Sequence, residues 1–216
     1  MIDENRKTII PYYFDDLSGT FKKGDVIPVF DGSYFIKDIF LVDIDQNGFL
    51  DIVVVGFGSS SIAKLTFIIN QKGVLTSDPA QHISMKILKH VPQPFQIFDE
   101  DSQMLISYLV VSINEIQDDN RRVVTLTKDN QIVTKNFEDF LNPDCKKPLI
   151  LNFLSNEFGG AFIDLNMDCR PDLLLETHGS EGRQQEIYTF TKKGFCFARS
   201  VTVPVDYGFI SFVDLG

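Results

Sequence analysis

The sequence predicts an all-β protein. Its apolar runs are short, rich in β-branched and aromatic side chains, and bounded by Gly, Asn, Asp or Pro, which is typical of strands. Long stretches with apolar residues at the period of a helix are missing from the sequence. Phe is abundant, with 20 residues, and Trp is absent. Together with many Val and Ile residues, this composition favours β structure.

The expected strands follow one another along the chain and are joined by hairpin turns. They cover residues 40–42, 52–56, 64–69, 106–112, 122–127, 160–163, 173–175, 185–190 and 209–213. Residues 70–73 and 191–194 each lie between two apolar runs and end on a Gly, at a position that requires positive φ. Residues 128–130 form a similar turn without Gly. Hairpins at this interval predict repeated antiparallel sheets.

Composition bounds the classes of function. The chain has 216 residues, of which 44% are hydrophobic and 23% charged, so it is able to bury a core. Its formal net charge of −10 argues against nucleic-acid binding and against contact with an anionic membrane surface. His82, His90 and His178 stand apart from any Ser or Cys nucleophile motif. The sequence therefore predicts that the chain is not an enzyme.

An internal repeat carries most of the functional information. Residues 40–54 align without gaps to residues 161–175. In both segments two apolar residues are followed by Asp, an apolar residue, Asp or Asn, any residue, and Asn or Asp. Three further residues, a last Asp and three apolar residues complete the pattern. A third copy begins at residue 209, and the sequence ends inside it at Gly216. Between the first two lies a degenerate copy at 94–102, in which Phe98 occupies the place of the first Asp.

The spacing of the repeats predicts a partial β-propeller built from four-stranded blades. Repeat starts at residues 43, about 98, 164 and 214 suit such blades with insertions. The expected blade cores are 36–92, 93–155 and 156–206, with a truncated blade from 207. Because so few blades cannot close a ring and a repeat array needs a capping partner, we expect the sequence to be a fragment that lacks the remaining blades.

The first loop of the repeat predicts a Ca²⁺ site. Ca²⁺ takes six to eight oxygen ligands, and a loop with oxygen side chains at alternate positions is able to curl around one ion. The expected ligands are the side chains of Asp43, Asp45, Asn47 and Asp51 and the carbonyl of Phe49. Gly48 permits the sharp turn at the sixth position.

The second loop predicts a weaker site of the same kind. Its expected ligands are the side chains of Asp164, Asn166, Asp168 and Asp172 and the carbonyl of Arg170. Cys169 stands where Gly is wanted, and a side chain at positive φ costs on the order of 1 kcal/mol. The degenerate copy, which lacks the first Asp, is expected to bind nothing.

Two alternatives compete with this interpretation. An EF-hand needs a Glu at the twelfth position and flanking helices, but Val54 and Leu175 occupy that position and both flanks are apolar runs. The Asp and Asn side chains would otherwise only cap tight turns. Two aligned copies with identical spacing favour metal binding over capping.

The three cysteines, Cys145, Cys169 and Cys196, are widely spaced and odd in number. Without a CxxC pair, neither a zinc site nor a redox motif is predicted, and no disulfide framework is supported. We expect free and partly buried thiols. Residues 1–10 do not resemble a signal peptide, and no apolar run is long enough to span a bilayer. Taken as complete, the sequence predicts a cytoplasmic chain.

The repeats resemble the FG-GAP (VCBS-type) repeats of integrin α-subunit β-propellers. Residues 57–58 and 158–161 echo the Phe-Gly and Gly-Ala-Pro elements of that family. Closer similarity, to the T-cell immunomodulatory protein family, extends over about residues 36–216 and is carried by residues 94–97, 161–175, 186–188, 194–195 and 209–214. This resemblance implies an extracellular β-propeller on a single-span membrane protein, with Ca²⁺ in some blades.

We therefore expect a non-enzymatic Ca²⁺-binding module that mediates protein–protein or cell-surface interaction. No nucleic acid and no direct membrane contact are expected of this segment, and its protein partner is left open. One alternative is an accessory propeller domain of a larger hydrolase. Another is a cytosolic propeller scaffold.

Overall fold

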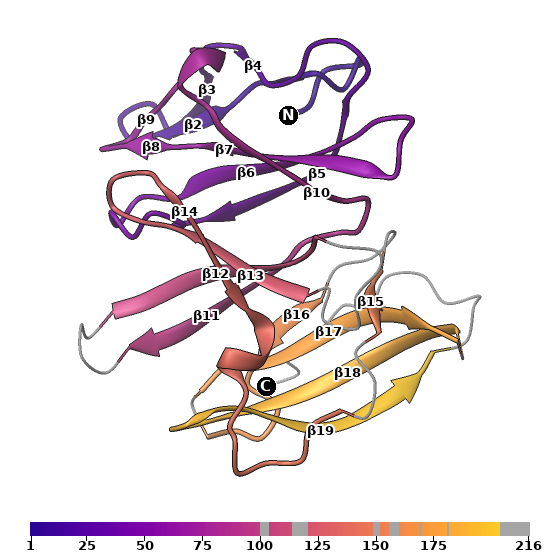
Figure 1. The fold of residues 1–216 in the computed structure, drawn as a ribbon. Helices are drawn as coiled ribbons and strands as arrows, with labels where there is room; N and C mark the ends of the chain where they lie inside the picture. Colours follow the sequence, from indigo (N-terminus) through magenta and orange to yellow (C-terminus); the bar gives the residue numbers. More distant parts are fainter. Residues whose placement is uncertain are drawn as a thin grey trace.

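The computed structural model describes residues 1–99, 104–113, 121–148, 152–155, 160–168, 170–180 and 182–203. Among these residues there are strands and two short 3₁₀ helices but no α-helix, so the predicted all-β class is confirmed. No helix in the described part of the chain is long and apolar enough to cross a membrane. The strands form three main antiparallel sheets that stack on one another (Figure 1).

The first sheet is an antiparallel meander with an inserted hairpin. It contains β5 (Phe35–Val42), β6 (Asp51–Phe57), β7 (Ile62–Ile68) and β10 (Ile83–Leu88), in the order β10-β7-β6-β5. Strand β6 is apolar without alternation because both of its faces are covered. Val53 and Val55 pack in a core shared with the second sheet, whereas Ile52 and Val54 pack in the core on the opposite face.

The second sheet is a meander of four strands in sequence order: β11 (Gln93–Asp99), β12 (Met104–Ser112), β13 (Arg121–Leu126) and β14 (Ile132–Asn136). Its strands also bury both faces. Leu109 and Val111 pack against the first sheet, and Tyr108 and Val110 belong to a core shared with the third sheet. The second sheet therefore lies between the other two (Figure 1).

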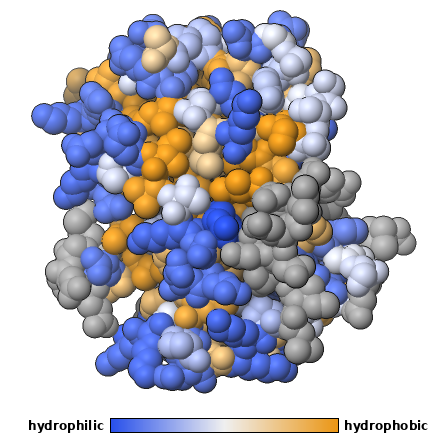
Figure 2. All heavy atoms as spheres, in the orientation of Figure 1, coloured by the Kyte–Doolittle hydropathy of each residue, from blue (hydrophilic) through white to orange (hydrophobic). Residues whose placement is uncertain are grey.

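The third sheet contains β17 (Asp172–Gly179), β18 (Gly182–Thr191) and β19 (Gly194–Thr202). Two short strands, β15 (Phe153–Leu154) and β16 (Ala161–Ile163), both pair with β17. Figure 2 shows that apolar side chains reach the surface mainly across the middle of the molecule, and polar ones cover its upper and lower ends.

Residues before the first sheet cover its outer face. Strands β1 (Thr8–Ile9) and β4 (Ile27–Pro28) pair with each other, and Ile9, Ile27 and Val29 pack against the buried residues of β6. Strands β2 (Tyr12–Asp15) and β3 (Thr20–Lys23) form a separate hairpin, as do β8 (Asn70–Gln71) and β9 (Val74–Leu75). The 3₁₀ helices are η1 (Pro79–Gln81) and η2 (Phe137–Phe140).

The turns match the sequence pattern closely. Gly73 and Gly194 have φ of 90° and 119°, so the predicted positive φ is confirmed at both positions. Asn130 has φ of 60° and provides the same turn without Gly, because Asn tolerates the left-handed region. Phe98 of the degenerate copy lies in β11 and pairs with Leu105. Residues 100–103 and the expected third copy at 209–214 lie outside the described residues.

A disulfide corrects the prediction of free thiols. Cys145 and Cys196 are bonded, with 5.4 Å between their Cα atoms, which lies within the usual range for a disulfide. Their separation of 51 residues hides this pairing in the sequence. The segment after η2 runs beside the β18–β19 hairpin, where the Asn142 backbone N–H donates to the Phe195 carbonyl at 2.8 Å. The third cysteine, Cys169, lies outside the described residues.

Candidate metal-binding loops

The first acidic loop joins β5 to β6 at one end of the first sheet. Its backbone turns at two residues of positive φ, Gln46 at 62° and Gly48 at 87°. The conformation of Gly48 was predicted, and that of Gln46 was not. Asp43 accepts hydrogen bonds from the backbone N–H groups of Asn47 at 3.0 Å and Gly48 at 2.9 Å. The loop therefore folds back over the carboxylate of its first residue.

Asp51 anchors the loop from the first residue of β6. Its side chain is fully buried and accepts from the backbone N–H of Ile44 at 2.9 Å and of Asn70 at 2.7 Å. Burial raises the pKa of Asp51 to about 6, against the lowering effect of these hydrogen bonds. Burial also raises the pKa of Asp45. Neither carboxylate forms an ion pair with a Lys, Arg or His among the residues that the structure describes, and a bound cation would supply the opposite charge.

The carboxylates of Asp43, Asp45 and Asp51 converge. One oxygen of each lies within 4.8 Å of the others, and no other group of three His, Cys, Asp or Glu side chains in the described ranges does so. An ion with ligands at roughly 2.3–2.6 Å separates opposite ligands by about 5 Å. Three carboxylate oxygens this close together could hold one metal cation. Asn47 contacts this group as well, since its side-chain amide donates to Asp45 at 2.9 Å.

The second acidic loop repeats the local structure of the first. Asp172 is fully buried at the start of β17 and accepts from the backbone N–H of Leu165 at 2.9 Å and of Phe190 at 2.7 Å. Met167, with φ of 61°, takes the place of Gln46. The Asp168 backbone N–H donates to the first Asp of the loop, Asp164, at 3.1 Å, as Asn47 does in the first loop.

The two loops differ in how they group their acidic side chains. Asp164, Asn166 and Asp168 are exposed, whereas Asp45 is buried and Asp43 half-buried. The amide of Asn166 replaces the carboxylate of Asp45, and it donates to Asp168 at 3.1 Å. Each loop carries three carboxylates and one amide, so the second loop differs from the first in its lower burial and not in its charge. The carbonyls of Phe49 and Arg170 stay predicted ligands.

Sequence reasoning missed the contribution of Asn70. It was identified only as part of a turn, yet from β8 it closes the first loop at three points. Its backbone N–H donates to Asp51, its carbonyl accepts from the Asn47 side chain at 2.9 Å, and its side chain donates to the Leu50 carbonyl at 3.0 Å. Phe190, in the corresponding place of the second loop, supplies only the backbone N–H to Asp172. The sequence signal available for this contact was an Asn directly after the apolar run at residues 64–69.

No protein-family model, curated protein or solved structure matches the chain. The informative comparison is therefore internal, between the two loops. In both, an Asp at the ninth position is buried and accepts from the backbone N–H of the second residue of the loop and from that of a residue 19 or 18 positions further along the chain. This shared hydrogen bonding gives the aligned sequences a common structure.

We expect the metal-free chain to be more stable near pH 5 than near pH 7. The pKa of Asp51, about 6 when folded, exceeds the roughly 3.9 of an unfolded Asp. Between these values the folded state binds more protons, so its stability falls as the pH rises through this window. Denaturant unfolding in EDTA at both pH values measures the difference. In Asp51→Asn this side chain cannot titrate, so the difference in stability between the two pH values should be smaller. An equal pH dependence of the wild type and the variant would contradict the expectation.

Proposed function

We propose that the chain is a non-enzymatic Ca²⁺-binding module that acts through protein–protein or cell-surface contact, and that residues 43–51 hold the ion. The observation that carries this proposal is the convergence of the carboxylates of Asp43, Asp45 and Asp51, of which that of Asp51 is fully buried. Carboxylate and amide oxygens are the ligands that Ca²⁺ prefers. Asp43, Asp45, Asn47 and Asp51 would supply them, and the ion would neutralise carboxylates that burial otherwise destabilises.

The role of the ion in this proposal is structural. The loop joins two strands at the corner of a sheet, and Asn70 ties it to the hairpin that follows β7. A cation there would hold the end of β5, the loop and the start of β6 in one arrangement, to which Asn70 is joined by hydrogen bonds.

We further propose that the three stacked sheets are blades of an incomplete β-propeller of the FG-GAP (VCBS) type, related to the T-cell immunomodulatory protein family. Two features support this architecture. Each sheet contains at least three consecutive antiparallel strands, and both acidic loops connect two paired antiparallel strands, β5 to β6 in the first sheet and β16 to β17 in the third. The disulfide suits an extracellular location, because disulfides persist in oxidising compartments.

Calorimetric Ca²⁺ titration of the whole chain tests the metal site. Asp45→Ala should remove one binding site, because it deletes a carboxylate from the centre of the first loop. Asp129→Ala removes an exposed carboxylate from a turn outside both loops and should leave the stoichiometry unchanged. An unaltered stoichiometry in Asp45→Ala would sink the proposal.

Thermal unfolding provides a second readout of the same site. Metal that binds only the folded state stabilises it by about 2.7 kcal/mol at a concentration 100 times the Kd. EDTA should therefore lower the Tm of the Ca²⁺-loaded wild-type chain. Asp164→Ala should retain most of this shift, since the second loop is the weaker site.

A further inference from the structure

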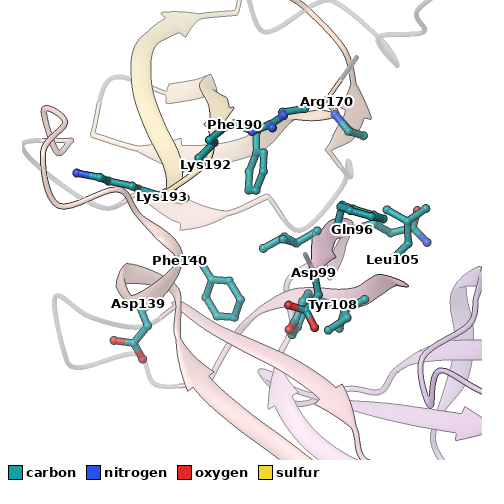
Figure 3. A pocket seen from close by; sticks show the side chains of 15 residues that line it. Gln96, Asp99, Leu105, Tyr108, Asp139, Phe140, Arg170, Phe190, Lys192 and Lys193 are labelled. Atoms are coloured by element: carbon teal, nitrogen blue, oxygen red, sulfur yellow. The ribbon is translucent and has the colours of Figure 1, made fainter. Parts of the chain in front are cut away.

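A groove of about 1070 Å³ lies between the second and third sheets. One wall is formed by β11 and β12, and the other by the second acidic loop, the end of β18 and the β18–β19 turn; η2 lies at one end (Figure 3). This volume is at the upper end of the roughly 300–1000 Å³ that ligand pockets occupy. It accommodates a short peptide segment.

Tyr108 presents an unused hydrogen-bond donor in this groove. The residue is only 8% exposed, and its ring packs against those of Phe95 and Phe140, with ring centroids 5.3 and 5.0 Å away. Its hydroxyl makes no hydrogen bond to any residue that the structure describes. Although the residue as a whole is buried, its hydroxyl oxygen reaches solvent in the groove and is available to a ligand. Burial, followed by the charge of Asp99, raises the pKa of Tyr108, so the hydroxyl keeps its proton at neutral pH.

The same wall exposes apolar surface beside Tyr108. Phe98 and Leu105 form a cross-strand pair of β11 and β12, and they are 47% and 49% exposed. Phe190 faces into the groove from β18 (Figure 3). Aromatic side chains around a concave surface anchor apolar groups of a partner. The groove therefore fits an apolar side chain next to a hydrogen-bond acceptor.

The charges of the groove are divided between its walls. Lys192 and Lys193 project from the β18–β19 turn, on the third-sheet side, and Asp99 and Asp139 lie on the second-sheet side (Figure 3). Lys193 pairs with Asp144 at 2.6 Å, but both are exposed, and such a pair is easily exchanged. Lys192 has no ion-pair partner among the described residues. Lys192 and Lys193 attract a carboxylate to this rim locally, against the overall negative charge of the chain, which is −10.

We propose that this groove binds a short extended peptide of a protein partner, with an apolar anchor side chain followed by an acidic one. The anchor packs against Phe98, Leu105 and Phe190. A backbone carbonyl of the peptide accepts from Tyr108, and the acidic side chain meets Lys192. This inference rests on the proposed protein-binding function and names the chemistry of the partner.

Selection from a displayed library of random heptapeptides tests the proposal. The whole chain is the target, and the Tyr108→Phe/Lys192→Glu variant is used for counter-selection. We expect the enriched peptides to share an apolar residue followed by Asp or Glu. By fluorescence anisotropy, they should bind the double variant at least tenfold more weakly than the wild type. No enrichment, or enrichment of basic peptides, would overturn the proposal.

Single variants assign the effect to the groove. Tyr108→Phe keeps the ring and should weaken binding about threefold or more, as loss of one hydrogen bond implies. Lys192→Glu should weaken it at least fivefold, whereas Lys128→Glu, the same charge change in a hairpin turn outside the groove, should change it less than twofold. Equal effects of the two charge changes would contradict the site.

The groove and the first acidic loop are tested separately. Asp45→Ala deletes a carboxylate of the first sheet and no group of the groove. It should therefore lose the Ca²⁺ site of the first loop and retain the enriched peptides within twofold. Loss of Ca²⁺ binding together with retained peptide binding would show that the two sites act independently. If the peptide selection fails and the Ca²⁺ stoichiometry is as expected, only the proposal for the groove is overturned.

Discussion

Arg121→Ala should destabilise the chain by about 3–5 kcal/mol, since it removes one partner of a buried ion pair. Arg121 starts β13 of the second sheet, and its guanidinium donates to the two carboxylate oxygens of Glu186, in β18 of the third sheet, at 2.7 and 2.8 Å. The side chains are 0% and 1% exposed. Without Arg121, a carboxylate stays buried with no charge to offset it. Equilibrium unfolding in urea measures the loss.

The pair is held by further contacts that make its geometry specific. Arg121 also donates to the Asn152 carbonyl at 2.6 and 2.9 Å, and Tyr188 donates its hydroxyl to Glu186 at 2.7 Å. Arg121→Lys cannot reproduce two parallel hydrogen bonds and should also be destabilising. As a control, Lys22→Ala breaks the ion pair of an exposed Lys with the half-buried Asp15 at the surface and should cost less than about 1 kcal/mol. Similar losses for Lys22→Ala and Arg121→Ala would contradict the buried role.

The pH dependence of stability offers an independent check on this pair. Burial alone would raise the pKa of Glu186, but the hydrogen bonds and the charge of Arg121 outweigh it, so the pKa is lowered. The stability that this carboxylate contributes is therefore present above the unfolded value, about 4.3, and is lost as the pH falls through the folded value. Arg121→Ala should remove this part of the acid sensitivity.

The sequence predicted what depends on local patterns. The continuous apolar run of β6 was expected to be a strand, and burial on both faces explains why it does not alternate. The positive φ of Gly48 follows from its place in the acidic loop. Alignment of the two copies placed Asp51 and Asp172 in equivalent positions before their shared hydrogen bonds were known.

Contacts between distant segments escaped prediction. Arg121 and Glu186 are 65 residues apart, and Asn70 reaches the first loop from a separate hairpin. No periodicity or motif links such residues, because only the stacking of sheets brings them together. Residues 1–34 carried no strong pattern either, although Ile9 and Ile27 cover the outer face of the first sheet.

The disulfide belongs to the same group of missed contacts. Gly194 was expected only to permit the positive φ of its turn. It also lets the backbone at Phe140 approach closely, because a Cβ at this position would lie 2.6 Å from the Phe140 carbonyl oxygen. This approach aligns the segment after η2 with β19 and brings Cys145 to Cys196. An odd number of widely spaced cysteines gave no indication of it.

Cys196→Ser should destabilise the oxidised chain by about 4 kcal/mol. The bond closes a loop with a sequence separation of 51 residues, and the chain entropy that such a loop removes from the unfolded state corresponds to this magnitude. Dithiothreitol should lower the stability of the wild type by a similar amount and leave Cys196→Ser unchanged. Guanidinium unfolding with and without reductant measures both effects.

Thiol counting distinguishes the disulfide from other causes of this loss. Of the three cysteines in the sequence, only Cys169 should react in the denatured, unreduced chain, and all three should react after reduction. Cys169→Ser should give no reactive thiol before reduction and keep its sensitivity to dithiothreitol. Three reactive thiols in the unreduced wild type would show that Cys145 and Cys196 are not bonded. They would also remove the support that the disulfide lends to an extracellular location.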